Sequence, residues 1–348
     1  MALFGLSNTR AITTISDSVH HAIDINIFER EFIDSSYFQR LHFILQNSTA
    51  FVSFPSNKNT RFPHSLGVAA VAGEIFSRSL SNASATDLRI LLPKMANFLL
   101  QLCEKLEGAT QRDGAFEEPP SSMEDALRRC DEAHTDTISG LSGFLHNPLH
   151  STSGSQSIPD EEDDTRGRVT FHERFGPFSV RFIVDTYWQA VRLYALMHDI
   201  GHLPMSHSFE AALESQAQLY TVRENEEASG EKFDVSVRLA YEEYERLLTE
   251  RRNEYKFDAD HYLSFFQDLL DIPSAEIEAA TFHKAFHEVR GISIFNRHAR
   301  KPGPGFPEEI IPYRRLVNHL CLAMIYSNAL APENTGKDTP HEHAFLYT

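Results

Sequence analysis

Residues 186–210 read TYWQAVRLYALMHDIGHLPMSHSFE and predict a helix that ends in a cluster of polar, reactive side chains. Val191, Tyr194 and Ala195 recur at helical spacing, which is typical of a helix with one buried face. Gly201 and Pro204 then end the helix. The side chains gathered around this end are His198, Asp199, His202 and His207. We therefore expect this stretch to carry the functional site.

Apolar residues elsewhere also follow a helical period. HSLGVAAVAGEIF (64–76) places Val68, Val71, Ala72, Ile75 and Phe76 on a predicted apolar face. FQRLHFILQN (38–47) spaces its apolar residues at i, i+3 and i+7, and LVNHLCLAMIY (316–326) is typical of a buried helix. Alternation typical of a strand occurs only around SVHHAIDIN (18–26). The sequence therefore predicts a mainly α fold.

Two stretches interrupt this pattern and are interpreted as insertions into one domain formed by residues 1–80 and 181–348. The first, 81–180, begins with an amphipathic helix, ILLPKMANFLLQLCEKLE, in which Pro93 suits the first turn. It then loses hydrophobic periodicity through EEPPSSMED (117–125) and STSGSQSIPDEEDDTRGR (151–168), so we expect partial disorder there. The second, 214–275, is a charged helical insertion within the domain.

Composition narrows the function classes. The chain has 348 residues, 41% of them hydrophobic, and a formal net charge of -17, which argues against strong nucleic-acid binding. No apolar run approaches the roughly 20 residues of a membrane span, so no membrane association is expected. Its 3 cysteines are too few for a disulfide framework. We expect a cytoplasmic protein.

The histidine cluster has the chemistry of a metal site. A neutral imidazole binds zinc, iron, manganese or nickel, and a neighbouring carboxylate favours divalent ions that activate water. Because adjacent helical residues point about 100° apart, His198 and Asp199 reach one ion only at the end of the helix. His202 is i+4 from His198 and shares its face. One His-Asp pair also occurs by chance in many chains, so the pair alone does not decide the function.

Four segments taken in order carry a resemblance to a known family. They are DSVHHAIDINIFEREFIDSSYFQRLHFILQN (17–47), NTRFPHSLGV (59–68), HDIGHLPMSHSFE (198–210) and HEVRGISIF (287–295). In this order they resemble the motifs of the HD-domain metal-dependent phosphohydrolases, and within them the deoxynucleoside triphosphate (dNTP) triphosphohydrolases. The resemblance covers residues 13–80, 186–213 and 280–330. It implies an HD-domain helical bundle.

The resemblance also implies roles for single residues. His64, His198 and Asp199 would bind one divalent metal, which could be Fe, Mn, Zn, Ni or Mg. Arg61 and Gln46 would contact the substrate, Arg61 at a phosphate and Gln46 at the sugar. The catalytic group would consist of His202, His207, Glu210 and His287. In it, His207 would donate a proton to the departing oxygen while Glu210 orients its ring.

One element of the family pattern has no match. The resemblance implies a further aspartate ligand on a late helix, and no residue after His287 corresponds to it. Asp338 lies in a stretch rich in proline and glycine. We therefore expect the C-terminal part of the family fold to be missing, either because the sequence is a fragment or because the protein works with an incomplete metal shell.

The function expected from these residues is hydrolysis of a dNTP to deoxynucleoside and triphosphate by a homo-oligomer. Two alternatives stay open. The same metal motif serves nucleotide phosphomonoesterases and phosphodiesterases. A catalytically inactive nucleotide-binding or scaffold protein would explain both the unmatched aspartate and the large insertions.

Overall fold

The structure is a computed structural model that describes residues 12–113, 173–208, 211–212, 286–300 and 302–330. Within these residues helices predominate, and the strands form two antiparallel hairpins. The prediction of a mainly helical fold is confirmed. The expected disorder around 117–125 and 151–168 and the second insertion at 214–275 lie outside the described residues.

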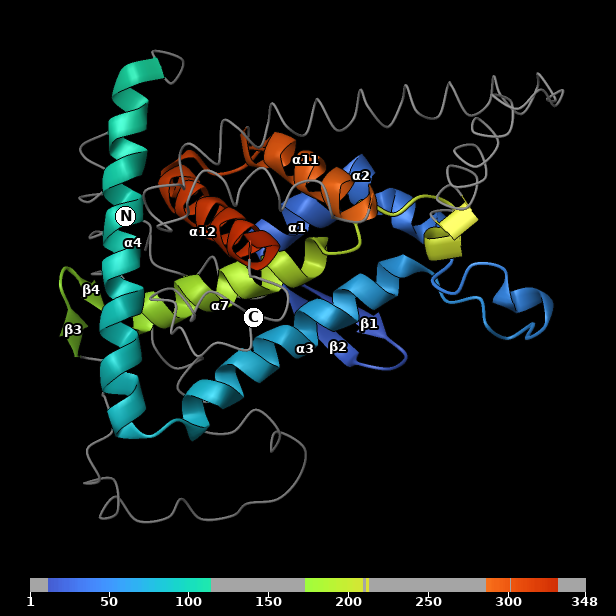
Figure 1. The fold of residues 1–348 in the computed structure, drawn as a ribbon, viewed down its shortest axis with the longest axis horizontal. Helices are drawn as coiled ribbons and strands as arrows, with labels where there is room; N and C mark the ends of the chain where they lie inside the picture. The colour runs from blue at the N-terminus through green and yellow to red at the C-terminus, as the bar shows by residue number, and fades with distance from the viewer. Residues whose placement is uncertain (1–11, 114–172, 209–210, 213–285, 301, 331–348) are drawn as a thin grey trace, which may run out of the picture.

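Helix α7 (Val180–Met197) is the centre of the described fold (Figure 1). Nearly all of its side chains are buried, because α3 (Arg61–Asn82) and α12 (Ile311–Leu330) pack along it and α4 (Ala85–Asp113) crosses its N-terminal end. The helix begins after Ser179, whose hydroxyl accepts a hydrogen bond from the backbone N–H of Phe182. The helices predicted at 186–197 and 316–326 are therefore confirmed.

Helix α3 forms where it was predicted, and Val68, Ala72 and Phe76 of its predicted apolar face pack partly buried against the core. Val71 and Ile75 of the predicted apolar face are 39% and 60% exposed. The face that packs against α7 carries small residues, including Ala69 and Gly73. A Cβ on Gly73 would lie 2.8 Å from Cδ of Arg192 in α7. Close packing of two helices thus favours small residues there, so hydrophobicity alone located the buried side of α3 only in part.

Helix α4 begins at Ala85, five residues before Ile90, where the sequence suggested its start. Ser84 precedes it, and the Ser84 hydroxyl accepts a hydrogen bond from the backbone N–H of Asp87. Pro93 therefore lies inside the helix and not in its first turn, so that prediction was wrong. Side chains of α4 enter the common core, and the hydroxyl of Tyr187 in α7 donates to the carbonyl of Met95.

The N-terminal segment forms a hairpin and short helices. Strands β1 (Thr13–Asp17) and β2 (His21–Ile25) pair antiparallel where alternation was noted, and α1 (Ile27–Ile33) follows. The single helix expected over 38–47 is interrupted. Helix α2 (Ser36–Gln39) continues only as the 3-10 turn η1 (Arg40–Phe43), and Leu45 pairs with Thr60 in an isolated β-bridge. This bridge directs the chain toward the start of α3.

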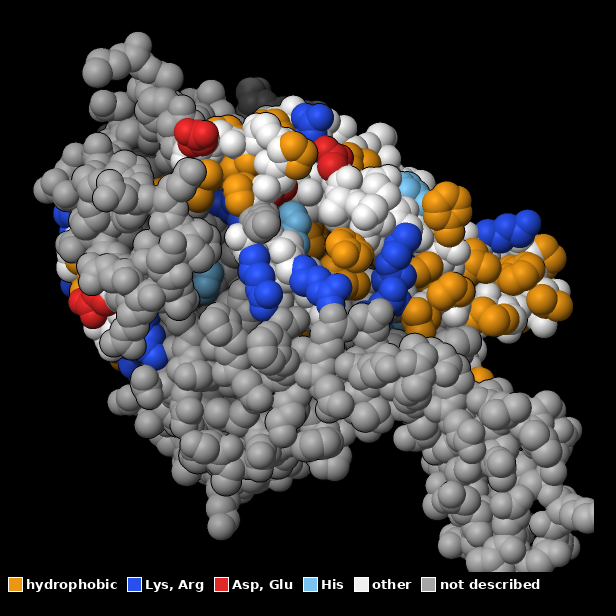
Figure 2. Space-filling view, turned by 90° about the horizontal axis from the view of Figure 1, so that it is seen from above, with side chains coloured by type: hydrophobic (Ala, Val, Ile, Leu, Met, Phe, Trp, Pro, Cys, Tyr) orange, Lys and Arg blue, Asp and Glu red, His pale blue; other side chains and the backbone are white. Residues whose placement is uncertain are grey.

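Helix α11 (Phe286–Arg300) precedes α12 in the chain. The other described elements are short: η2 (Ala50–Val52), β3 (Arg174–Phe175), β4 (Phe178–Ser179) and η4 (Glu308–Ile310). Among the described helices none is long and apolar enough to cross a membrane. Figure 2 shows hydrophobic side chains gathered at one end of the described surface. Exposed apolar side chains of the described residues include Phe43, Val52 and Phe54.

Candidate functional site

The three predicted metal ligands come together at the end of α7. Nitrogen or oxygen atoms of His64, His198 and Asp199 all lie within 4.8 Å of one another. Oδ2 of Asp199 is 3.5 Å from Nε2 of His64 and 3.3 Å from Nε2 of His198. His64 lies in the first turns of α3, and His198 is the residue that ends α7. Two imidazoles and a carboxylate from separate elements fit a divalent cation.

The two histidines of this cluster differ in how readily they lose a proton. Nδ1 of His198 lies 2.6 Å from the carbonyl oxygen of Ala195, and its Nε2 lies 3.3 Å from Oδ2 of Asp199. Burial lowers the pKa of His198, but its hydrogen bonds with Asp199 and Ala195 outweigh burial and raise the pKa, so a metal at Nε2 would have to replace a proton there. Burial lowers the pKa of His64 more than the charge of Asp199 raises it, so its ring is neutral at neutral pH. Neutral imidazole is the form that binds a metal.

Asp199 is the electrostatic centre of the site. Its side chain is buried and receives a hydrogen bond from Nη1 of Arg61. Burial alone would raise the pKa of Asp199, but hydrogen bonds with His198 and His202 and the charge of Arg61 outweigh it and hold the pKa far below its usual range. The carboxylate is therefore ionised, as a metal ligand must be.

Arg61 is not a surface residue that caps a helix. It is 3% exposed, and besides Asp199 it contacts Ser206, whose hydroxyl accepts from Nε at 3.0 Å. Met205 and Ser206 both have positive φ, 66° and 54°. Left-handed backbone in residues other than glycine costs of order 1–3 kcal/mol each and collects at functional sites. The bonds from Arg61 hold this turn beside Asp199.

A second cluster contains three of the four predicted catalytic residues. Ring nitrogens of His202, His207 and His287 lie within 4.8 Å of one another. His202 is fully buried, whereas His207 is exposed. The rings of His202 and His287 stack with centroids 3.9 Å apart at 12°, and His207 meets His202 edge-on at 4.5 Å and 87°. Parallel rings cannot both direct a lone pair at one ion, so this arrangement suits contact with substrate better than metal binding.

The relation of His202 to His198 differs from the prediction. Because α7 ends at Met197, the two residues do not share a helix face. His202 lies in the following turn, where its backbone N–H donates to the carbonyl of Asp199. Its Nε2 is 3.2 Å from Oδ1 of Asp199, so that carboxylate contacts both clusters.

One predicted site residue, Gln46, is not joined to the clusters, and another, Glu210, lies outside the described residues. Gln46 is half-buried after η1, and in the described part of the chain its side chain makes no hydrogen bond to either cluster. Its backbone N–H donates to Asn59. Asp338 lies outside the described residues as well.

The structure adds residues that the sequence did not single out. Ser206 holds Arg61. His20, in the β1–β2 turn, lies against Gly67, one turn after His64, and its charge contributes to the lowered pKa of His64. Two further arginines, Arg40 and Arg290, contact the turn after α7. All four lie within the quoted motif segments, but no spacing or residue pattern in those segments singled them out.

Comparisons with known proteins give short matches. No family model matches the chain. It is 38% identical over 78 residues to an uncharacterised protein of Methanocaldococcus jannaschii, covering 22% of this chain and 17% of that protein. It is 33% identical over 72 residues to the deoxynucleoside triphosphate triphosphohydrolase SAMHD1 homolog of Dictyostelium discoideum, covering 21% and 14%. It is 35% identical over 66 residues to the deoxynucleoside triphosphate triphosphohydrolase SAMHD1 of Danio rerio, covering 19% of this chain and 11% of that protein.

The chain thus matches less than a fifth of the length of each of these three relatives. Two of the three are named as dNTP triphosphohydrolases. The matches indicate a partial relation to SAMHD1 proteins, confined to short segments.

Proposed function

We propose that this protein is a metal-dependent phosphohydrolase that cleaves a dNTP to deoxynucleoside and triphosphate. The observation that carries the proposal is the meeting of His64, His198 and Asp199 at one point, from α3 and the end of α7. The partial similarity to SAMHD1 proteins supports the choice of substrate. An HD-domain arrangement of the helices is part of the same proposal.

His64, His198 and Asp199 would hold the metal. When bound, a divalent cation supplies Lewis acidity that activates water and offsets phosphate charge. Asp199 reaches this position already ionised, and His198 presents Nε2 because its Nδ1 is engaged by Ala195. The ligands are therefore preorganised for a cation.

The second cluster would act on the phosphate chain. His207 is exposed beside the buried His202, so it can contact a ligand that enters from solvent. We assign His207 the role of general acid, which donates a proton to the departing 5′ oxygen. His202 and His287 would face the phosphates, Gln46 the sugar, and Glu210 would orient His207. Arg61 would offset developing charge, while its present contacts also orient Asp199.

One observation favours a second candidate, nucleotide binding without turnover. Arg61 donates to Oδ2 of Asp199, the same oxygen that faces His64 and His198. A cation at that oxygen competes with the guanidinium. If the guanidinium prevails, the pocket binds a nucleotide but does not hydrolyse it.

Product analysis tests these proposals. The purified protein with Mn²⁺ is incubated with the four dNTPs, and the products are separated by anion exchange and identified by ³¹P NMR. Intact triphosphate supports the proposal, whereas orthophosphate or pyrophosphate indicates a phosphomonoesterase or phosphodiesterase. Binding of dNTP without products supports the second candidate. His198→Ala should lose both metal and turnover, and His21→Asn, at an exposed histidine, is the matched control.

A further inference from the structure

The turn after α7 buries three consecutive residues, Ile200, Gly201 and His202, whose carbonyl groups need donors. The last carbonyls of a helix have no partner inside it. A buried carbonyl left unpaired costs about 1–3 kcal/mol. Many helices solve this with a glycine of positive φ after the last turn. Gly201 does not have positive φ, so the donors must come from elsewhere in the fold.

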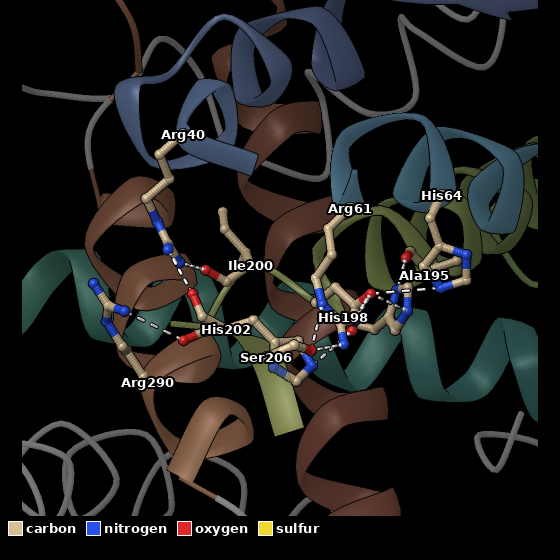
Figure 3. Close-up of polar contacts among 11 residues, drawn as sticks. Arg40, Arg61, His64, Ala195, His198, Ile200, His202, Ser206 and Arg290 are labelled. Atoms are coloured by element: carbon tan, nitrogen blue, oxygen red, sulfur yellow. Dashed lines mark hydrogen bonds and ion pairs between the residues drawn. The ribbon is translucent and has the colours of Figure 1, made fainter. Parts of the chain in front are cut away.

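Two arginines from distant parts of the chain supply these donors (Figure 3). Arg40, in η1, donates through Nη1 to the carbonyl of His202 at 2.5 Å and through Nη2 to that of Ile200. Arg290, in α11, donates through Nη1 to the carbonyl of Gly201 at 3.4 Å. Three successive carbonyls of one turn are thus held by two guanidinium groups.

We propose that Arg40 and Arg290 are positioning residues that hold the turn at 198–202 in the conformation that joins the two histidine clusters. The proposal rests on the proposed function, because it concerns the same site. Asp199 lies directly before the three residues whose carbonyls the arginines bind, and His202 is the last of those three residues. Arg290 is also one turn after His287 on α11, so it fixes the spacing between the stacked rings of His202 and His287.

The guanidinium group suits this role for a physical reason. It is planar and presents several N–H donors in fixed directions, so one side chain can reach two carbonyls. Burial and the charge of Arg290 lower the pKa of Arg40 to about 10, which still leaves it charged at neutral pH. A lysine offers a single ammonium centre and cannot reproduce this geometry.

The protein contains a matched control for a purely structural effect. Arg314 in α12 is buried and also donates to two successive carbonyls, those of His298 and Ala299 at 2.9 and 3.1 Å. It binds Glu31 as well. These carbonyls lie at the far end of α11 from His287, where no member of either cluster lies. Replacing Arg314 removes the same kind of bond away from the site.

The test compares Arg40→Lys, Arg290→Lys and Arg314→Lys in the full chain. Co²⁺ affinity is measured by titration of its visible absorption bands, and amide hydrogen exchange is followed over residues 198–207. Arg40→Lys should weaken Co²⁺ binding about 10–100-fold, the usual cost of losing a group that orients metal ligands. Arg290→Lys should act in the same direction but less, because its bond is longer. Arg314→Lys should change Co²⁺ affinity by less than about two-fold, as expected for a distant site.

Each outcome decides the proposal. Equal losses of Co²⁺ affinity in Arg40→Lys and Arg314→Lys would overturn it, since the effect would then follow global stability. If the unaltered protein binds no Co²⁺, the proposed metal site fails, and the exchange data decide the positioning role alone. Faster exchange over 198–207 in Arg40→Lys than in Arg314→Lys supports it, and equal exchange overturns it. If Arg40→Lys does not fold, the same comparison is made with Arg290→Lys.

Discussion

Asp199 Oδ1 lies 3.2 Å from Nε2 of His202, while the other oxygen of the same carboxylate faces His64 and His198. A single buried side chain therefore joins the proposed metal ligands to the histidines that would act on substrate. A substitution of Asp199 should therefore alter the geometry of both clusters.

The first prediction concerns this carboxylate. Asp199→Asn keeps the size of the side chain but removes its charge, and so should weaken Mn²⁺ binding by at least about 10–100-fold. It also leaves Arg61 buried without its anionic partner, which should lower the free energy of unfolding. Calorimetric titration with Mn²⁺ and urea denaturation measure the two effects. Asp34→Asn, which alters an exposed pair with Arg30, is the control and should change neither.

The second prediction concerns the partner of Arg61. Ser206→Ala removes the hydroxyl that accepts from Nε of Arg61, so a buried charged donor loses a bond. We expect the free energy of unfolding to fall by about 1–3 kcal/mol in urea denaturation. Ser208→Ala, two residues later at an exposed position, should have little effect. Equal stability of the two variants would show that the contact between Arg61 and Ser206 is not formed in solution.

The third prediction concerns acid stability. Burial and the charge of Arg314 lower the pKa of His298 to about 4, although Glu31 opposes the shift. Between about pH 6.5 and pH 4, His298 therefore binds a proton in the unfolded chain but not in the folded chain. The free energy of unfolding consequently decreases as the pH falls from 6.5 toward 4. At pH 5 the loss is roughly 2 kcal/mol relative to pH 7.5.

Replacement of His298 tests this assignment. His298→Gln should reduce the change in unfolding free energy between pH 7.5 and pH 5 by that amount. Comparison with the unaltered protein cancels the opposite contribution of Asp185, whose pKa burial raises to about 7. His21→Asn, at an exposed histidine with φ of 60°, should leave the pH profile unchanged. An unchanged profile in His298→Gln would contradict the assignment.

The sequence predicted the helices and the meeting of His64, His198 and Asp199 better than it predicted other contacts between elements. The end of α7 could be located from Gly201 and Pro204, and His64 from its motif. The buried side of α3 could be located only in part, because its most buried positions include Ala69 and Gly73, which suit close packing and carry little hydrophobicity. The early start of α4 depends on one hydroxyl, that of Ser84.

Contacts with backbone carbonyls leave still less trace in a sequence. Arg40 and Arg290 bind backbone carbonyl groups. Because every residue has a backbone carbonyl, no pattern of side chains predicts such a contact. The same holds for Arg61, whose motif position suggested a phosphate contact but whose partners in the fold are Asp199 and Ser206.

The last prediction concerns the contact between the turn after α7 and helix α11, where two glycines meet. A Cβ on Gly201 would lie 1.6 Å from the carbonyl oxygen of His287 and 2.7 Å from the backbone nitrogen of Gly291. Neither backbone can yield without moving α11. A Cβ on Gly291 would meet only ordinary contacts, 3.5 Å from Ile200 and 3.6 Å from Gly201. Close approach of the backbones therefore requires glycine at position 201 but not at position 291.

This asymmetry predicts opposite outcomes for two similar substitutions. Gly201→Ala should push α11 away, separating the rings of His202 and His287 and destabilising the fold by about 1–3 kcal/mol, the usual cost of overpacking. Gly291→Ala should be tolerated or even stabilise by about 0.5–1 kcal/mol, because alanine is the better helix residue. Urea denaturation gives the stabilities, and histidine ring shifts in ¹H–¹⁵N NMR spectra report the stacking. Equal tolerance of both substitutions would mean that the turn and α11 lie farther apart in solution than in this structure, and His287 would then no longer belong to the histidine pocket.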